Sequence, residues 1–103
     1  MFQPSSPKSS GPRRLRPSRK LPGRALAGET VVVDSRARRV FVMNSVGGVI
    51  WSGVERGATS DEIVAELVAR FRVDEERAGA SVGRFFDRLE SAGLAVPEAA
   101  DAG

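Results

Sequence analysis

Residues 24–43 have the two-residue alternation and the β-branched content of short strands. Residues 30–33 and Arg39–Met43 form two such runs, and the linker 34–38 between them begins with turn-forming residues. Together they predict an antiparallel hairpin. Residues 24–27 should add a short edge strand, which makes a three-stranded antiparallel sheet.

Side-chain direction in the last of these strands follows from the same alternation. Arg39, Phe41 and Met43 share one face of the strand, and Val40 and Val42 share the other. We expect Phe41 and Met43 to face the helices that follow.

Two amphipathic helices follow the sheet. Asn44 is a favoured N-cap for the first helix, and Gly57 can supply the left-handed residue that ends it. Thr59 and Glu62 form the T-x-x-E capping box that opens the second helix. Trp51 is interpreted as a core residue rather than one that stacks on a ligand. The apolar residues at helical spacing are Val46, Val49, Ile50 and Val54 in the first helix and Ile63, Val64, Leu67, Val68 and Phe71 in the second.

A third helix should begin after Asp74, which can act as its N-cap, and end before Gly93. Leu94 should then fold back onto the core. The expected core stripe of this helix consists of Ala78, Val82, Phe85 and Leu89. Because the chain shows no internal repeat and no parallel crossover unit, we predict an α+β fold, a three-stranded antiparallel sheet followed by three helices.

The first 20 residues differ in composition from the rest of the 103-residue chain. They hold four of the six prolines, five serines and six basic residues, with no acidic residue. Such a segment has too little apolar surface to offset the entropy of ordering it, so residues 1–20 are predicted to be disordered. The domain should span residues 21–96, and residues 97–103 should form a flexible C-terminus. The net charge of +3 becomes −3 once the basic tail is set aside.

The chain contains neither cysteine nor histidine, which removes thiol nucleophiles, imidazole acid–base chemistry and the usual zinc ligands. The carboxylates of the third helix are better explained by the helix dipole and surface ion pairs than by catalysis; they are Glu75, Glu76, Asp87 and Glu90. We therefore expect no enzyme activity, no cofactor and no metal site. No apolar stretch approaches the ~20 residues of a membrane span, and a cytoplasmic location is expected.

Several motifs follow one another in a distinctive order between residues 29 and 94. They are Met43-Asn44, a helix with Ile50-Trp51, the Gly57-x-Thr59 turn, the Phe71-x-Val73-Asp74 link and a closing L-x-x-x-G-L from Leu89 to Leu94. In this order they resemble the PqqD family, the leader-peptide recognition elements of ribosomally made, modified peptides (RiPPs). The chain departs from the family where Ser45-Val46-Gly47-Gly48 replaces the usual Thr-Gly or Thr-Ala, and in its long basic extension.

The resemblance implies a winged-helix-like module that binds the N-terminal leader of a precursor peptide. The leader would add a strand to the edge of Arg39–Met43 and lie in a groove against the third helix. The module would act as a peptide chaperone that presents the attached core peptide to a separate modifying enzyme, such as a radical enzyme, a cyclase or a protease. It would itself do no chemistry.

Backbone pairing alone would not hold a leader at micromolar strength. About five hydrogen bonds contribute roughly 5 kcal/mol, whereas micromolar binding needs about 8 kcal/mol, so apolar anchors must contribute. We expect Gly79, Gly83 and Glu90 to form a shallow trough on the third helix, with Phe86 as its wall; the alternative is that Phe86 is simply a core residue. The predicted peptide-binding residues are Arg39, Val40, Phe41, Val42, Met43, Val82, Gly83, Phe86 and Glu90.

A winged-helix-like fold with a basic tail also fits a DNA-binding protein. However, the second helix carries Asp61, Glu62 and Glu66 against Arg70 alone, which does not suit a helix that reads the major groove, so we expect no specific nucleic-acid binding.

Two groups of basic residues remain open to interpretation. The arginines near the hairpin turn are expected to be solvated, although they also suit acidic leader residues; they are Arg36, Arg38 and Arg39. The basic tail is either a tether that docks a partner enzyme or solubilising disorder.

Overall fold

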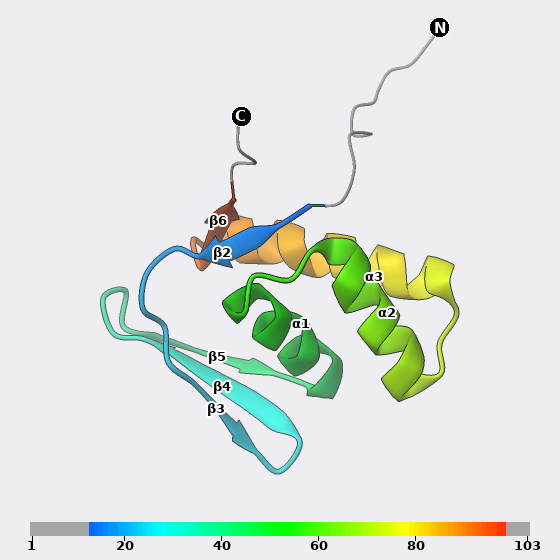
Figure 1. Ribbon diagram of the computed structural model, residues 1–103. Helices are drawn as coiled ribbons and strands as arrows, with labels where there is room; N and C mark the ends of the chain where they lie inside the picture. Colours follow the sequence, from blue (N-terminus) through cyan, green and yellow to red (C-terminus); the bar gives the residue numbers. More distant parts are fainter. Residues whose placement is uncertain (1–12, 99–103) are drawn as a thin grey trace, which may run out of the picture.

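The computed structural model describes residues 13–98, in which a three-stranded antiparallel sheet packs against three helices (Figure 1). The strands of this sheet are β3 (Gly23–Leu26), β4 (Glu29–Asp34) and β5 (Arg39–Met43). The helices are α1 (Ser45–Glu55), α2 (Ser60–Phe71) and α3 (Glu75–Ser91). The predicted α+β class, its three-stranded sheet and its three helices are confirmed.

Two hairpins set the register of the sheet. Ala27 and Gly28 join β3 to β4, and both have positive φ (49° and 84°), as a two-residue turn matched to the twist of the strands requires. β4 pairs with β5 from Thr30 opposite Met43 to Asp34 opposite Arg39. The strand order β3-β4-β5 leaves β5 as an edge strand, with no further strand of residues 13–98 beside it.

The helices start and stop where the sequence signals predict. Side chains of Asn44, Thr59 and Asp74 accept hydrogen bonds from backbone N–H groups in the first turns of α1, α2 and α3. Gly57 and Gly93 adopt positive φ just beyond α1 and α3, where left-handed residues end helices.

Helix α1 is the central element, with contacts to β2, β4, β5, α2 and α3. Trp51 is 1% exposed, so the interpretation of this residue as core is confirmed. Glycines bring the neighbouring elements close to α1: a Cβ on Gly53 would lie 2.6 Å from Ile63, and one on Gly48 would lie 2.5 Å from Thr30 Oγ1. Gly48, one of the residues that depart from the family pattern, therefore has a packing role.

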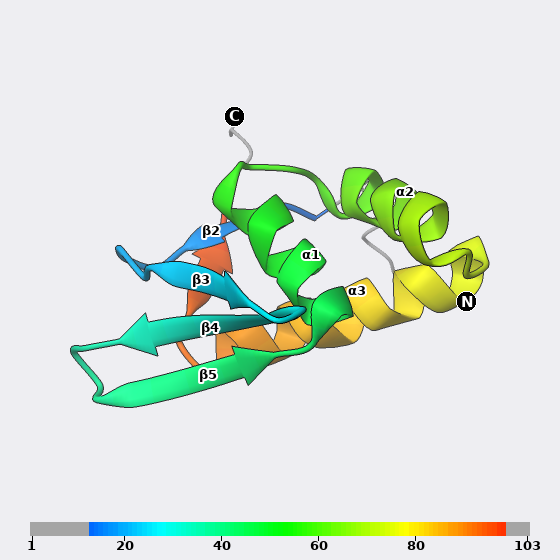
Figure 2. The ribbon, with the colours of Figure 1, turned by 90° about the horizontal axis from the view of Figure 1, so that it is seen from below.

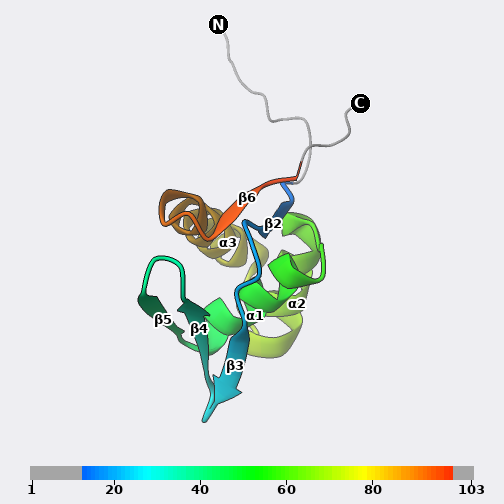
Figure 3. The same ribbon diagram turned by 90° about the vertical axis from the view of Figure 1, so that its left-hand side faces the viewer.

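The structure differs from the sequence prediction at residues 13–20. Residues Leu15–Pro17 form β2, which pairs antiparallel with β6 (Ala95–Pro97) on the far side of α3 from β5 (Figure 3). The prediction of disorder is wrong here because Leu15, whose neighbours in the sequence are basic residues and prolines, is buried in the core. Strand β6 likewise includes Pro97 from the predicted flexible C-terminus. The predictions for residues 1–12 and 99–103 lie outside the described residues.

Candidate functional site

Strand β5 carries an open edge of the sheet and lies next to α3 (Figure 2). Met43 is buried and Phe41 is half-buried against the core, whereas Val40 and Val42 are 61% and 62% exposed. The prediction that Phe41 and Met43 face the helices is confirmed. An extended segment placed along this edge would direct every second side chain toward the same side as Phe41 and Met43.

Two adjoining cavities form a groove between β5 and α3. The first has a volume of about 300 Å³; its lining includes Met43, Asn44, Ser81, Arg84, Phe85 and Arg88. The second has a volume of about 160 Å³; its lining includes Phe41, Met43, Phe85, Arg88, Leu89 and Ala92. The first cavity is the more polar, and the second is lined mainly by apolar side chains.

Phe85 stands where the two cavities meet. A Cβ on Gly47 of α1 would approach Cε1 of Phe85 to 3.0 Å, so a glycine at this position leaves the ring room to lie against α1. The ring is only half-buried, and its free surface contributes to the groove.

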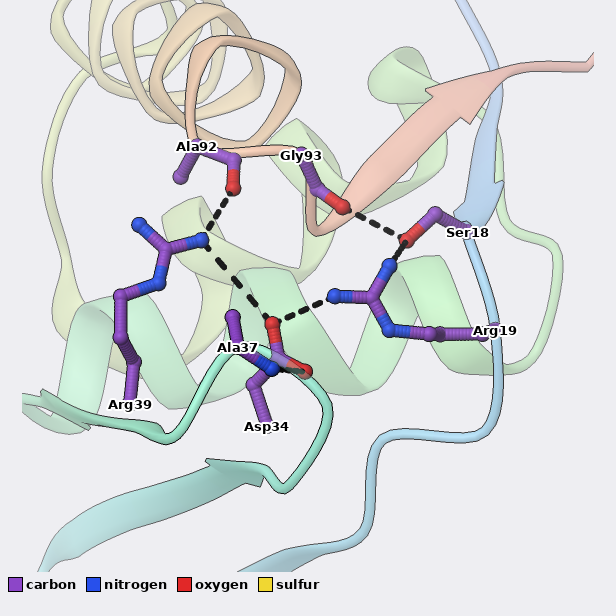
Figure 4. A network of polar contacts seen from close by, with 7 residues as sticks. All are labelled: Ser18, Arg19, Asp34, Ala37, Arg39, Ala92 and Gly93. Carbon is purple, nitrogen blue, oxygen red and sulfur yellow. Dashed lines mark hydrogen bonds and ion pairs between the residues drawn. The ribbon is translucent and has the colours of Figure 1, made fainter.

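Arg39 closes the end of the groove that lies near the C-terminus of α3. Its Nη2 donates a hydrogen bond to the carbonyl oxygen of Ala92 at 2.8 Å, and its guanidinium lies 4.9 Å from the centre of the Phe41 ring. The same nitrogen is 3.9 Å from Oδ2 of Asp34 (Figure 4). The guanidinium of Arg39 is therefore engaged within the protein rather than simply solvated.

Asp34, at the end of β4, is completely buried and holds the network in Figure 4 together. Its Oδ2 accepts a hydrogen bond from Arg19 Nη2 at 2.5 Å, and its Oδ1 accepts one from the Ala37 N–H at 3.3 Å. Burial alone raises the pKa of Asp34, but these hydrogen bonds and the charges of Arg19 and Arg39 outweigh it and hold the pKa below its ordinary value. The carboxylate thus stays ionised at neutral pH.

The network also fastens the N-terminal segment to the end of α3. Ser18 Oγ donates a hydrogen bond to the carbonyl oxygen of Gly93 at 2.6 Å and accepts one from Arg19 Nη1 at 3.3 Å. The segment before β3 therefore links the end of β4 and its turn to the end of α3, next to Ala92 in the lining of the second cavity.

The trough predicted on α3 is wrong, because its expected wall, Phe86, is completely buried. Val82, expected both in the core stripe and among the peptide-binding residues, is 1% exposed and belongs to the core. Phe86 belongs to the core, and the guanidinium of Arg13 lies 5.2 Å from the centre of its ring. Glu90 is 3.3 Å from Arg13 Nη2 and so belongs to the same side of the helix. At 100° per residue Gly83 and Glu90 lie nearly opposite the groove, and nothing in the structure explains the glycines at 79 and 83.

Four residues of α3 that line the groove were not among the predicted peptide-binding residues. They are Ser81, Arg84, Phe85 and Arg88. Their i, i+3, i+4, i+7 spacing marks one face of a helix, which was the available signal. The expectation of a groove against the third helix was correct, but the face of the helix was not.

The part of the chain that the structure describes has few clusters of side chains that could bind a metal ion or take part in catalysis. Residues 13–98 contain no group of three or more carboxylates that could hold a metal ion. Glu75 and Glu76 lie in the first turn of α3, where the helix dipole favours negative charge. None of the helices in this range is long and apolar enough to cross a membrane.

The fold and the groove define a small α+β module in which the open edge of β5 lies beside a groove. Residues 29–95 match the PqqD family, described as coenzyme PQQ synthesis protein D, and the chain belongs to this family. No curated protein matches the chain.

Two solved structures are similar to the chain. A structure of TbiB1 in complex with the TbiA(beta) leader peptide has 25% sequence identity and a TM-score of 0.73, over 82% of this chain and 98% of that one. A lasso peptide synthetase B1 complexed with the leader peptide has 20% identity and a TM-score of 0.69, over 84% of this chain and 100% of that one. The second similarity concerns the fold alone.

Proposed function

We propose that this protein binds the leader segment of a ribosomally made precursor peptide and presents it to a separate modifying enzyme. The observation that carries the proposal is the open edge of β5 beside a groove whose other wall is α3. Membership of the PqqD family and the similarity to TbiB1 in complex with a leader peptide support it.

In this proposal the leader adds a strand to β5 and directs alternate side chains into the groove. The backbone of Arg39–Met43 supplies the hydrogen bonds, and Phe41, Met43 and Phe85 supply apolar contacts. About five backbone hydrogen bonds at roughly 1 kcal/mol each, together with two buried apolar side chains at ~1.5 to 3 kcal/mol each, reach the ~8 kcal/mol of micromolar binding.

The proposal assigns the chemistry to a partner enzyme, such as a radical enzyme, a cyclase or a protease. The chain has neither cysteine nor histidine, and its buried carboxylate, Asp34, is held by arginines away from the groove cavities. We place the protein in the cytoplasm, where ribosomal precursor peptides are made.

Backbone methylation of the leader tests the strand-addition mode. The probe is a synthetic leader of a candidate precursor peptide, methylated at one backbone nitrogen at a time and titrated calorimetrically against the full chain. Because only every second N–H of an edge strand faces its neighbour, affinity should fall at alternate positions and be retained between them. A scrambled leader is the control for sequence, and equal tolerance at every position would reject strand addition.

The charge distribution on α2 argues against DNA recognition by this helix. Asp61 and Glu62 lie in its first turn, and Arg70 is 3.5 Å from Glu66. Arg56, just before the helix, also pairs with Glu66 at 2.7 Å. A helix with these charges would repel the phosphates that flank a major groove.

A further inference from the structure

Arg84 and Arg88 stand one helical turn apart on the groove wall formed by α3. Arg84 lines the first cavity, and Arg88 lines both cavities. Both residues are exposed, and within residues 13–98 neither makes an ion pair. By contrast, Arg39 at the end of the groove is bonded to Ala92 and faces Asp34. The guanidinium groups of Arg84 and Arg88 are thus available to bind a ligand in the groove.

The charges of α3 are separated by side. Asp87 and Glu90 face the N-terminal segment, where Arg13 Nη2 lies 3.2 Å from Asp87 Oδ1 and 3.3 Å from Glu90 Oε2. Arg84 and Arg88 face β5 across the groove. These two acidic residues are therefore engaged elsewhere and do not neutralise the groove, and the other two, Glu75 and Glu76, lie in the first turn of the helix.

The surroundings of the two arginines favour a carboxylate as their partner. An arginine guanidinium offers a planar fork of donors that matches a carboxylate, and the apolar side chains beside it reduce screening by water. The floor formed by Phe41, Met43 and Phe85 suits apolar side chains, and the adjacent edge of β5 suits an extended backbone. Both features favour a peptide over a nucleic acid as the occupant.

We propose, building on the leader-binding function above, that Arg84 and Arg88 select leader segments that carry an aspartate or glutamate side chain at the first cavity. The apolar second cavity takes an aliphatic or aromatic side chain of the same segment. Residues two apart on a strand point to the same side and are separated by about 6.5 Å, which suits adjoining cavities. The motif recognised is thus an acidic residue with an apolar residue two positions away.

Selection from a random peptide library tests this inference and does not require the sequence of the leader. Short random peptides are displayed and selected on the full-length protein. An enriched peptide is then synthesised with its acidic residue intact and with that residue replaced by its amide. We expect enrichment of the acidic and apolar pair, and about a tenfold loss of affinity for the amide form, equivalent to ~1.4 kcal/mol.

Variants connect this preference to the two arginines. With Arg84→Gln and Arg88→Gln together, the acidic and amide peptides should bind with equal affinity, and with Arg84→Glu and Arg88→Glu the preference should reverse toward basic peptides. Arg16→Glu and Arg24→Glu, exposed on β2 and β3, form a control with the same change in net charge.

The outcomes separate this inference from the function on which it builds. Enrichment of peptides without an acidic residue, or an acid preference that persists in the Gln double variant, would overturn the inference and leave leader binding intact. Absence of any enriched peptide would overturn both. Binding of a single-stranded oligonucleotide in place of peptides, lost in the Gln double variant, would assign the two arginines to phosphate instead.

Discussion

Asp34 is the only completely buried charged side chain in residues 13–98, and its ionised form depends on Arg19, Arg39 and the Ala37 N–H. A carboxyl whose pKa is lowered by folding contributes stability above its unfolded pKa, and the contribution is lost as the pH falls through the folded pKa. The structure therefore predicts that acid weakens this network by protonating Asp34.

The substitution Asp34→Asn tests the network. It should lower the melting temperature at neutral pH, because Arg19 loses its charged partner, and the decline of stability below about pH 4 should become less steep. Thermal unfolding followed by circular dichroism at neutral pH and at about pH 3 gives both quantities. An unchanged pH dependence in the variant would contradict this role for Asp34.

The neighbouring residues Phe85 and Phe86 should respond differently to the same substitution. Phe86→Ala should reduce the free energy of unfolding by about 3 to 5 kcal/mol, because its ring is completely buried. Phe85→Ala should cost less than about half of this value, because the ring is only half-buried, but should weaken leader binding. Urea unfolding and leader titration of both variants measure these two effects. Equal losses of stability would contradict the assignment of Phe86 to the core and Phe85 to the groove.

The sequence could not distinguish these two phenylalanines. Phe85 and Phe86 follow Val82 by three and four positions, and both spacings place a residue on one helical face. The choice depends on how α1, α2 and β6 pack against α3, and this is set by long-range contacts. Capping residues were predicted correctly because a cap is a local hydrogen bond within a few residues.

Strands β2 and β6 show how a composition argument fails for a short element. The segment around Leu15 reads as polar and Pro-rich, yet a single buried leucine and a partner strand far along the chain order it. The sheet β3-β4-β5, by contrast, was predictable because its strands are joined by short turns and show clear alternation.

Leu15→Ala tests whether β2 belongs to the domain. The loss of this buried side chain should reduce the free energy of unfolding by about 2 to 5 kcal/mol. Arg16→Ala in the same strand is exposed and should change it by less than about 0.5 kcal/mol. Chemical unfolding of the full-length variants provides the comparison. Equal stability of the two variants would show that β2 does not belong to the folded domain.

The groove is assembled from parts of the chain that lie far apart. Strand β5 supplies the open edge, α1 supplies Gly47 behind Phe85, and α3 supplies the opposite wall. The N-terminal segment contacts the residues after α3 through Ser18 and the end of β4 through Arg19. The open strand edge was predictable from the family resemblance and the strand order. Which residues of α3 face the groove depends on how the helix is rotated about its axis, and no local pattern determines this rotation.

The most direct test of leader binding at the groove is a titration of the ¹⁵N-labelled full chain with candidate leader peptides, in which the amide shifts are followed by NMR. We expect shifts concentrated in Arg39–Met43 and around Ser81, Phe85 and Arg88, with little change around Gly79 and Gly83. Leader binding at the groove is contradicted if no leader shifts the β5 amides while duplex DNA produces salt-sensitive shifts, or if the leader shifts only the opposite side of α3.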